Sequence, residues 1–154
     1  MTSASDVYQL FIKHCDEHQI PYEKHDDNLT LKINVRGEDL PQPTVVYVIE
    51  RANVVMIRSP FPFSIPEDKR PEAAIGITIA NYGMINGCFE MDMRDGEIGY
   101  KIAQGFHDID FSDEMISYMF TLAFTTTDKF NDKFFGLAMG MFSLEQFIAA
   151  VQNN

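Results

Sequence analysis

The sequence predicts an α+β domain, in which helices pack on one antiparallel sheet of about five or six strands. Three observations support this class. Residues 29–36 alternate apolar and polar side chains, as a half-buried strand does. Asp95 and Gly96 stand between two further alternating segments and form a typical two-residue hairpin turn. Residues 112–138 repeat apolar side chains at a spacing of three and four, which indicates a long helix that covers the sheet.

Length and charge limit the kinds of protein the chain can be. Its 154 residues fit a single domain, residues 1–154, and 45% of them are hydrophobic. That content forms a core without disulfides or a structural metal. Acidic residues number 23 and basic residues 12, a net charge of -11. The chain lacks the surplus of cations that neutralises phosphates, so we expect no nucleic-acid partner.

The sequence also predicts where the protein works. No apolar segment approaches the roughly 20 residues that cross a bilayer, and residues 1–6 show no signal peptide. Cys15 and Cys88 are far apart in the sequence, and we expect reduced thiols rather than a disulfide. The prediction is a cytoplasmic protein with no membrane partner and no cofactor.

A helix and then strands are predicted for the N-terminal part. The helix spans about residues 5–18, with Ser5 as its N-cap, because a serine oxygen can accept from a first-turn amide. A turn signal at residues 26–28 joins a short strand, residues 22–25, to the alternating strand that follows.

Two segments near the middle of the chain are apolar at every position. Residues 45–49 and 54–57 predict a central hairpin that is buried on both faces. Helices cover one face of a sheet, so the other face needs a further helix, a second subunit or a partner segment. Residues 37–43 are predicted to form a loop, and residues 59–66, with three prolines, no regular element.

A helix and a hairpin are predicted next. The helix runs from about Asp68 or Pro71 to Tyr82, with Ile75, Thr78, Ile79 and Tyr82 on one face. A two-residue turn then fixes the register of the hairpin at residues 87–103. The pairs expected on its core face are Phe89 with Ile102, Met91 with Tyr100 and Met93 with Ile98, and Glu90 opposes Lys101 on the other face.

Helices are predicted for the rest of the chain. Ser112 is the N-cap of the long helix, which residues 125–127 either weaken or restart because they are β-branched. Gly140 is its expected end. Ser143 and Gln146 form a capping box that opens a last helix, to about residue 151.

A set of turn and packing residues in the C-terminal half forms a recognisable motif. Its members are Asn81, Gly87, Phe89, Asp92, Asp95, Gly96, Tyr100, Ser112, Glu114 and Ile116. The motif resembles that of the YbjN-type domain family, which shares its fold with bacterial type III secretion chaperones. The resemblance implies a type III secretion chaperone-like α/β sandwich, frequent homodimers and binding of protein segments rather than catalysis.

Apolar side chains of the central hairpin and of the proline-rich segment are the predicted contacts for a partner. They are Val46, Val48, Val55, Phe61, Phe63 and Ile65. Phenylalanines on a proline-stiffened loop would form a preorganised binding lip. The alternative is that these residues complete the core of the single chain, since large apolar residues are mostly buried.

Histidines offer two competing sites. His14 and His18 lie four residues apart on one predicted helix, where both can reach one metal ion. Because no third ligand has a suitable spacing, two half-exposed rings at a helix edge are the favoured interpretation. A pocket near His18, Tyr100 and His107 is expected if the chain is instead a small-molecule or metal-binding module or an enzyme.

The sequence favours a binding protein over an enzyme. No P-loop, dinucleotide-binding glycine pattern or nucleophile elbow occurs. We expect a non-enzymatic chaperone-like or regulatory domain, a homodimer that holds a segment of another protein on an apolar sheet surface. The alternatives are the module or enzyme with the histidine pocket, and a structural subunit of a larger assembly.

Overall fold

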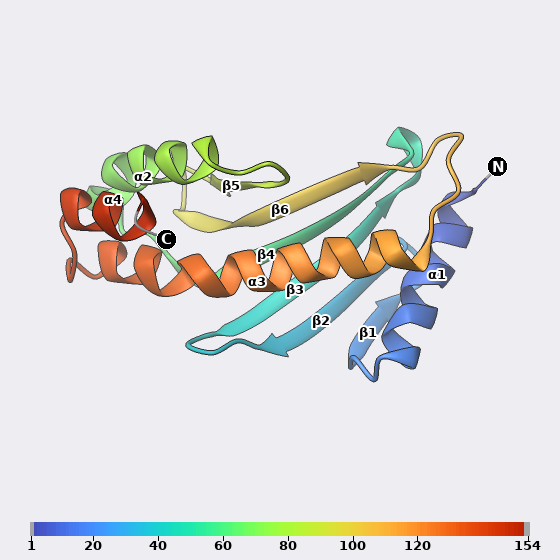
Figure 1. Cartoon of the computed structure of the whole chain (residues 1–154). Helices are drawn as coiled ribbons and strands as arrows, with labels where there is room; N and C mark the ends of the chain where they lie inside the picture. Colours follow the sequence, from blue (N-terminus) through green and yellow to red (C-terminus); the bar gives the residue numbers. More distant parts are fainter. Residues whose placement is uncertain (1, 153–154) are drawn as a thin grey trace.

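A computed structural model describes residues 2–152 as one six-stranded sheet with four α-helices (Figure 1). The strands lie in the order β1-β2-β3-β4-β6-β5, and all neighbours are antiparallel. The predicted α+β class is therefore confirmed. The elements are α1 (Ala4–Glu17), β1 (Tyr22–His25), β2 (Thr30–Arg36), β3 (Pro41–Ile49), β4 (Val54–Ser64), α2 (Arg70–Tyr82), β5 (Cys88–Met91), β6 (Glu97–Gly105), α3 (Asp113–Ala138) and α4 (Leu144–Gln152).

The long helix α3 organises the layers. Figure 1 shows it crossing the sheet obliquely, with α1 beside its start and with α2 and α4 near its end. It contacts β3, β4 and β6, while α1 contacts both α3 and β3. The second helix, α2, packs on β5 and α4.

The core lies between α3 and the sheet. Leu31, Val46, Ile57 and Ile102 stand side by side across four strands, and none is more than 5% exposed. Burial of each such side chain contributes about 1.5–3 kcal/mol. Towards α4 the core is aromatic, and its contacting rings belong to Phe61, Phe89, Phe130, Phe134 and Phe147.

The central hairpin forms as predicted but is buried on one face only. β3 turns into β4 through a short 3-10 turn that ends at Asn53, in the left-handed region with φ 51°. Burial alternates along β3: Val46 and Val48 are buried, while Val45 and Tyr47 stay partly exposed. The continuous apolar segments therefore do not have two covered faces within the chain.

The proline-rich segment is a strand, which corrects the prediction of an irregular stretch. β4 continues through Pro60 and Pro62 to Ser64. β3 stops pairing with β4 at Arg58, and beyond it only β6 pairs with β4. Proline is tolerated where a strand has a free side, because the missing N–H is not needed there. The predicted loop before β3 is also shorter, since β3 begins at Pro41.

The β5–β6 hairpin has a longer turn than predicted. Phe89 pairs with Tyr100 and Met91 with Ile98, a register two residues away from the expected one. The reason is that Asp92 still bonds across to Glu97, so the turn takes more residues than Asp95 and Gly96 alone. A shift of two keeps each side chain on its face. Met93 falls in the turn and is 53% exposed, against the prediction. Glu90 still forms an ion pair with Lys101, now across a diagonal.

Serine caps begin three of the helices. Ser3, not the predicted Ser5, caps α1: its Oγ accepts from the Asp6 N–H at 3.1 Å, and the Asp6 carboxylate accepts from the Ser3 N–H at 2.9 Å. Ser112 and Ser143 cap α3 and α4 as predicted.

The helix α3 is continuous, without the predicted weakening at residues 125–127. Thr125 Oγ1 donates to the Thr121 carbonyl at 2.6 Å, and Thr127 is buried. α3 ends before Gly140, whose φ is 69°. Within residues 2–152, neither this helix nor any other combines the length and the apolar content needed to cross a membrane.

Replacement of the α1 cap tests the observed start of this helix. We expect Ser3→Ala to lower the free energy of unfolding by about 1 kcal/mol, because a first-turn amide loses its acceptor. Ser5→Ala removes a hydroxyl of the same kind inside the helix and is expected to change stability by less than about 0.5 kcal/mol. Urea denaturation of both variants measures this. Equal losses in the two would contradict the cap.

Alkaline pH is expected to destabilise the fold through Tyr8. Burial and the adjacent Asp26 carboxylate, which accepts from its hydroxyl at 3.0 Å, raise the pKa of Tyr8 to about 12. Because the neutral phenol is favoured in the fold, its contribution is complete below pH 10 and is lost as pH rises towards 12. Ultraviolet titration of tyrosinate should show one late-titrating phenol fewer in Tyr8→Phe than in the wild type and in Tyr82→Phe. An unchanged titration in Tyr8→Phe would refute the assignment.

Candidate functional site

Most of the predicted partner-binding side chains lie in the core. Phe63 is partly buried against Phe135. The other five, none more than 5% exposed, are Val46, Val48, Val55, Phe61 and Ile65. They complete the core of the single chain, as the alternative interpretation of the sequence holds. The pattern identified the strands but not which face of them is covered by the rest of the chain.

The outward side chains of the same strands form a surface that we call the open sheet face: Val45, Tyr47, Ile49, Val54 and Met56. All five are partly exposed. Beside them, Arg58 forms ion pairs with Glu90 at 3.0 Å and with Glu97 at 2.9 Å. This side of the sheet is therefore apolar at the open sheet face, over β3 and β4, and charged towards β5 and β6.

The structure does not bring His18, Tyr100 and His107 into one pocket, which corrects that expectation. Tyr100 is buried, which raises its pKa, and its hydroxyl donates to the Asn86 carbonyl at 2.9 Å. His107 follows the end of β6, beyond about 17 Å of strand from Tyr100, and is an exposed partner of Asp108. His18 lies at the end of α1, with its ring centroid 4.2 Å from that of His14.

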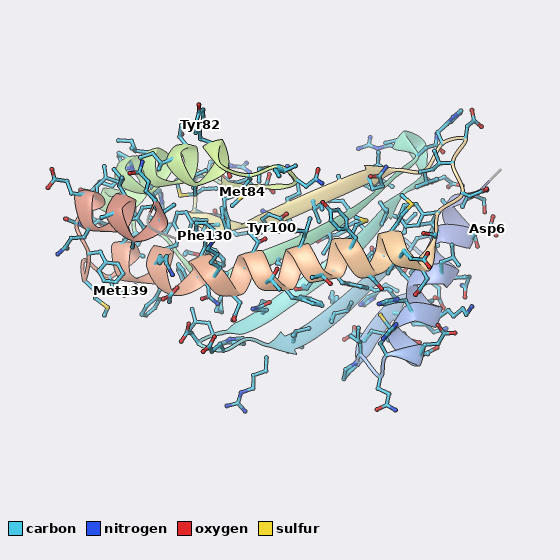
Figure 2. All side chains as sticks on the ribbon, viewed as in Figure 1. Asp6, Tyr82, Met84, Tyr100, Phe130 and Met139 are labelled. Carbon is cyan, nitrogen blue, oxygen red and sulfur yellow. The ribbon has the colours of Figure 1, made fainter. Side chains whose placement is uncertain are left out.

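Large exposed apolar side chains gather on the outer face of α2 and on the loop after it. Ile75 is 50% exposed, Tyr82 95%, Ile85 98% and Tyr118, on α3, 50%. With the partly exposed Ile79 they form what we call the apolar patch. Figure 2 shows Tyr82 pointing away from the molecule. An exposed group of this kind is typical of an interaction surface.

Small residues on the opposite face of α2 explain why its large apolar side chains point outwards. Ala73, Gly76 and Ala80 form the buried face of the helix. At Gly76, a Cβ would lie only 2.9 Å from the Phe147 ring of α4. Ile75 and Tyr82 lie on one face of α2 as predicted, but the apolar spacing did not indicate that this face is exposed. The available signal was the second stripe, of small residues, which allows close helix packing.

A groove of about 560 Å³ adjoins the apolar patch. It lies between the end of α2, the loop at residues 83–86, the middle of α3 and the end of α4. Met84, Leu122 and Phe130 line it, and Figure 2 shows Met84 and Phe130 between α2 and α3. Among the described lining residues Lys129 alone is charged. The groove therefore fits apolar side chains better than a charged ligand.

Hydrogen bonds hold the loop that carries Ile85. Asn81 fixes one end, because its Nδ2 donates to the Phe89 carbonyl at 3.0 Å and its Oδ1 accepts from the Phe89 N–H at 2.7 Å. Asn86 fixes the other end and donates to the Tyr118 hydroxyl at 2.5 Å. A surface held in this way loses little conformational entropy on binding.

The residues of the sequence motif build this loop. Asn81 and Phe89 make the clamp, and Tyr100 holds the Asn86 carbonyl. Gly87 has a φ of 71°, and a Cβ there would lie 2.1 Å from the Tyr100 hydroxyl oxygen, so glycine is required. The motif thus explains the position of the apolar patch.

The architecture is that of the YbjN-type and type III secretion chaperone-like α+β domains. A chain of the ExsC–ExsE complex matches with a TM-score of 0.58 and 9% identity, over 86% of this chain and 96% of that chain. YbjN from E. coli, described as a proposed transcription regulator, matches with a TM-score of 0.58 and 8% identity, over 94% and 88%. No family model matches the sequence, and neither does a curated protein.

These two likenesses confirm the fold that the motif implied. They extend beyond the C-terminal half that carries the motif, since they cover 86% and 94% of this chain. At 8% and 9% identity they show the fold alone.

Removal of the Asn81 clamp is expected to destabilise the protein. Asn81→Ala leaves the N–H and the carbonyl of Phe89 without their partner, so we expect a loss of about 2–4 kcal/mol in the free energy of unfolding. Asn34→Ala, at an exposed position of β2, should cost less than about 0.5 kcal/mol. Urea denaturation compares the two variants. A loss as small in Asn81→Ala as in Asn34→Ala would show that the clamp is dispensable.

Proposed function

We propose that this chain is a non-enzymatic, chaperone-like protein-binding domain that holds an apolar segment of another protein in the groove beside α2. One observation carries the proposal: Tyr82 and Ile85 are 95% and 98% exposed beside an apolar groove. Single exposed apolar residues are common, but a group of them on a rigid loop is typical of a binding surface.

The chemistry of the groove selects the kind of segment. The apolar side chains in its mixed lining, among them Met84, Leu122 and Phe130, favour aliphatic or aromatic anchors, which supply most of the affinity at protein interfaces. Lys129 at its wall favours a neutral or acidic flank over a basic one. We therefore propose an amphipathic or extended segment with few positive charges.

Two further observations support binding over catalysis. The ExsC–ExsE structure is a complex of two proteins, and one of its chains shares this fold. Burial raises the pKa of the Cys15 thiol to about 11. This thiol stays protonated near neutral pH, unlike the activated thiolate of a cysteine enzyme.

The proposal includes a homodimer in the cytoplasm, where free thiols such as Cys15 and Cys88 persist. The open sheet face is the proposed contact between the two copies. Its apolar side chains, among them Val45, Tyr47 and Met56, lie over β3 and β4 at the middle of the sheet. A twofold axis through this region would bring the same residues of both copies together.

A charge placed in the patch should abolish partner binding. We expect the tagged wild type to capture one near-stoichiometric protein from a lysate of its source organism, read by mass spectrometry. Ile85→Asp should reduce capture at least about tenfold, because it sets a carboxylate against an apolar anchor site. Met141→Asp is the matched control, since Met141 is 65% exposed on the turn before α4 and lies outside the patch.

Light scattering of the same variants separates partner from self-association. We expect the wild type and Ile85→Asp to be dimers, whereas Tyr47→Asp should be monomeric. If Ile85→Asp itself becomes monomeric, the patch is the contact between copies and the proposed partner site is wrong. Equal capture by Ile85→Asp and Met141→Asp would overturn the proposal as well.

A further inference from the structure

Two helices that are distant in the sequence bring three metal-ligating side chains together. His14 and His18 belong to α1 and to its C-terminal cap, and Asp113 opens α3. His14 Nδ1 lies 2.7 Å from Asp113 Oδ1. One ligand atom from each of the three residues lies within 4.8 Å of the other two. We propose that His14, His18 and Asp113 bind a divalent transition-metal ion, of which Zn²⁺ fits the ligands best.

The ligand types select the ion. Imidazole nitrogens suit zinc and its neighbours in the first transition row, whereas Mg²⁺ and Ca²⁺ prefer an all-oxygen shell. Two imidazoles and one carboxylate are a ligand set of known zinc sites, in which a fourth position holds water. His18 and Asp113 are exposed, so this fourth position faces solvent.

Modest side-chain rotations bring the three ligands to the ion. With metal–ligand distances of about 2.0–2.2 Å, tetrahedral ligand atoms lie about 3.3–3.6 Å apart. The 2.7 Å contact between His14 and Asp113 therefore has to widen, and the separations that reach up to 4.8 Å have to close. The ion would take the place of the shared proton. His14 is 4% exposed and stacks on Phe120 with ring centroids 5.5 Å apart, which fixes one ligand. The exposed side chains of His18 and Asp113 can rotate to meet it.

A structural hydrogen bond explains only part of this arrangement. A buried histidine needs a partner, and a carboxylate in the first turn of α3 interacts favourably with the helix dipole. This accounts for His14 and Asp113. The spacing of four residues brings the His18 ring beside that of His14, and this adds a second exposed imidazole next to the Asp113 carboxylate.

Metal binding would tie the end of α1 to the start of α3. The two helices otherwise meet through apolar rings such as Phe11 and Phe120, with centroids 5.5 Å apart. An ion bound in the fold and not in the unfolded chain stabilises the fold. No residue of α1 lines the groove beside α2, so the metal site does not depend on the proposed function.

The test uses the full chain and Zn²⁺ itself. Calorimetric titration should show one Zn²⁺ per chain, and Co²⁺ should give the visible absorption of a coordinated ion. His18→Ala and Asp113→Asn should each weaken binding at least about tenfold, because each removes a ligand. Both variants keep the buried His14, and Asp113→Asn keeps a side-chain oxygen that can accept from its ring N–H, so both should fold. Mg²⁺ in place of Zn²⁺ should show no binding.

Matched controls and stability complete the experiment. His107→Ala and Glu114→Gln, which alter an exposed histidine and an exposed carboxylate outside the cluster, should bind Zn²⁺ as the wild type does. Zn²⁺ at 100 times its dissociation constant should shift the unfolding equilibrium of the wild type about 100-fold, but not that of His18→Ala. Binding to His18→Ala as tight as to the wild type, or no binding to the wild type, would overturn the proposal.

Discussion

Phe89 joins the parts of this molecule that would otherwise be separate layers. Its ring meets Phe130 and Phe134 of α3, with centroids 5.0 Å and 5.2 Å away, and Tyr100 of β6 at 5.7 Å. Asn81, at the end of α2, forms hydrogen bonds with both the N–H and the carbonyl of Phe89. Because one residue ties the edge strand to both helices, the positions of α2 and of its exposed loop follow from the packing of the aromatic core.

The exposure of the apolar patch follows from a competition between two faces of α2. Ile75, Ile79 and Tyr82 bring more apolar area than Ala73 and Gly76, yet the small residues are buried. Close packing against Phe147 needs a surface without large side chains. The neighbouring helix therefore decides which face is inside, and the larger apolar stripe stays free to bind.

The sequence predicted what depends on local patterns and missed what depends on neighbours. Helix ends marked by Ser112, Ser143 and Gly140 agree with the structure because caps act within one turn. The hairpin register failed, since Asp92 extends the turn through a contact that the Asp95 and Gly96 pair does not reveal. For the candidate sites, the sequence pattern located the central strands and placed His14 and His18 on one helix. Which face of the strands is covered could not be predicted, because it depends on where α3 packs. The proposed role of Asp113 could not be predicted either, because α1 and α3 are far apart in the sequence and approach only in the fold.

The separation of β3 from β4 has a consequence for how the chain avoids self-aggregation. If their pairing continued beyond Val45 and Arg58, Pro43 would stand opposite Pro60. A free strand edge normally offers a ladder of N–H donors to any other extended chain. Here Pro43 and Pro60, with Pro62 further along, remove donors from both sides of the opening. The same prolines that end the ladder therefore make this strand edge a poor template for amyloid-like growth.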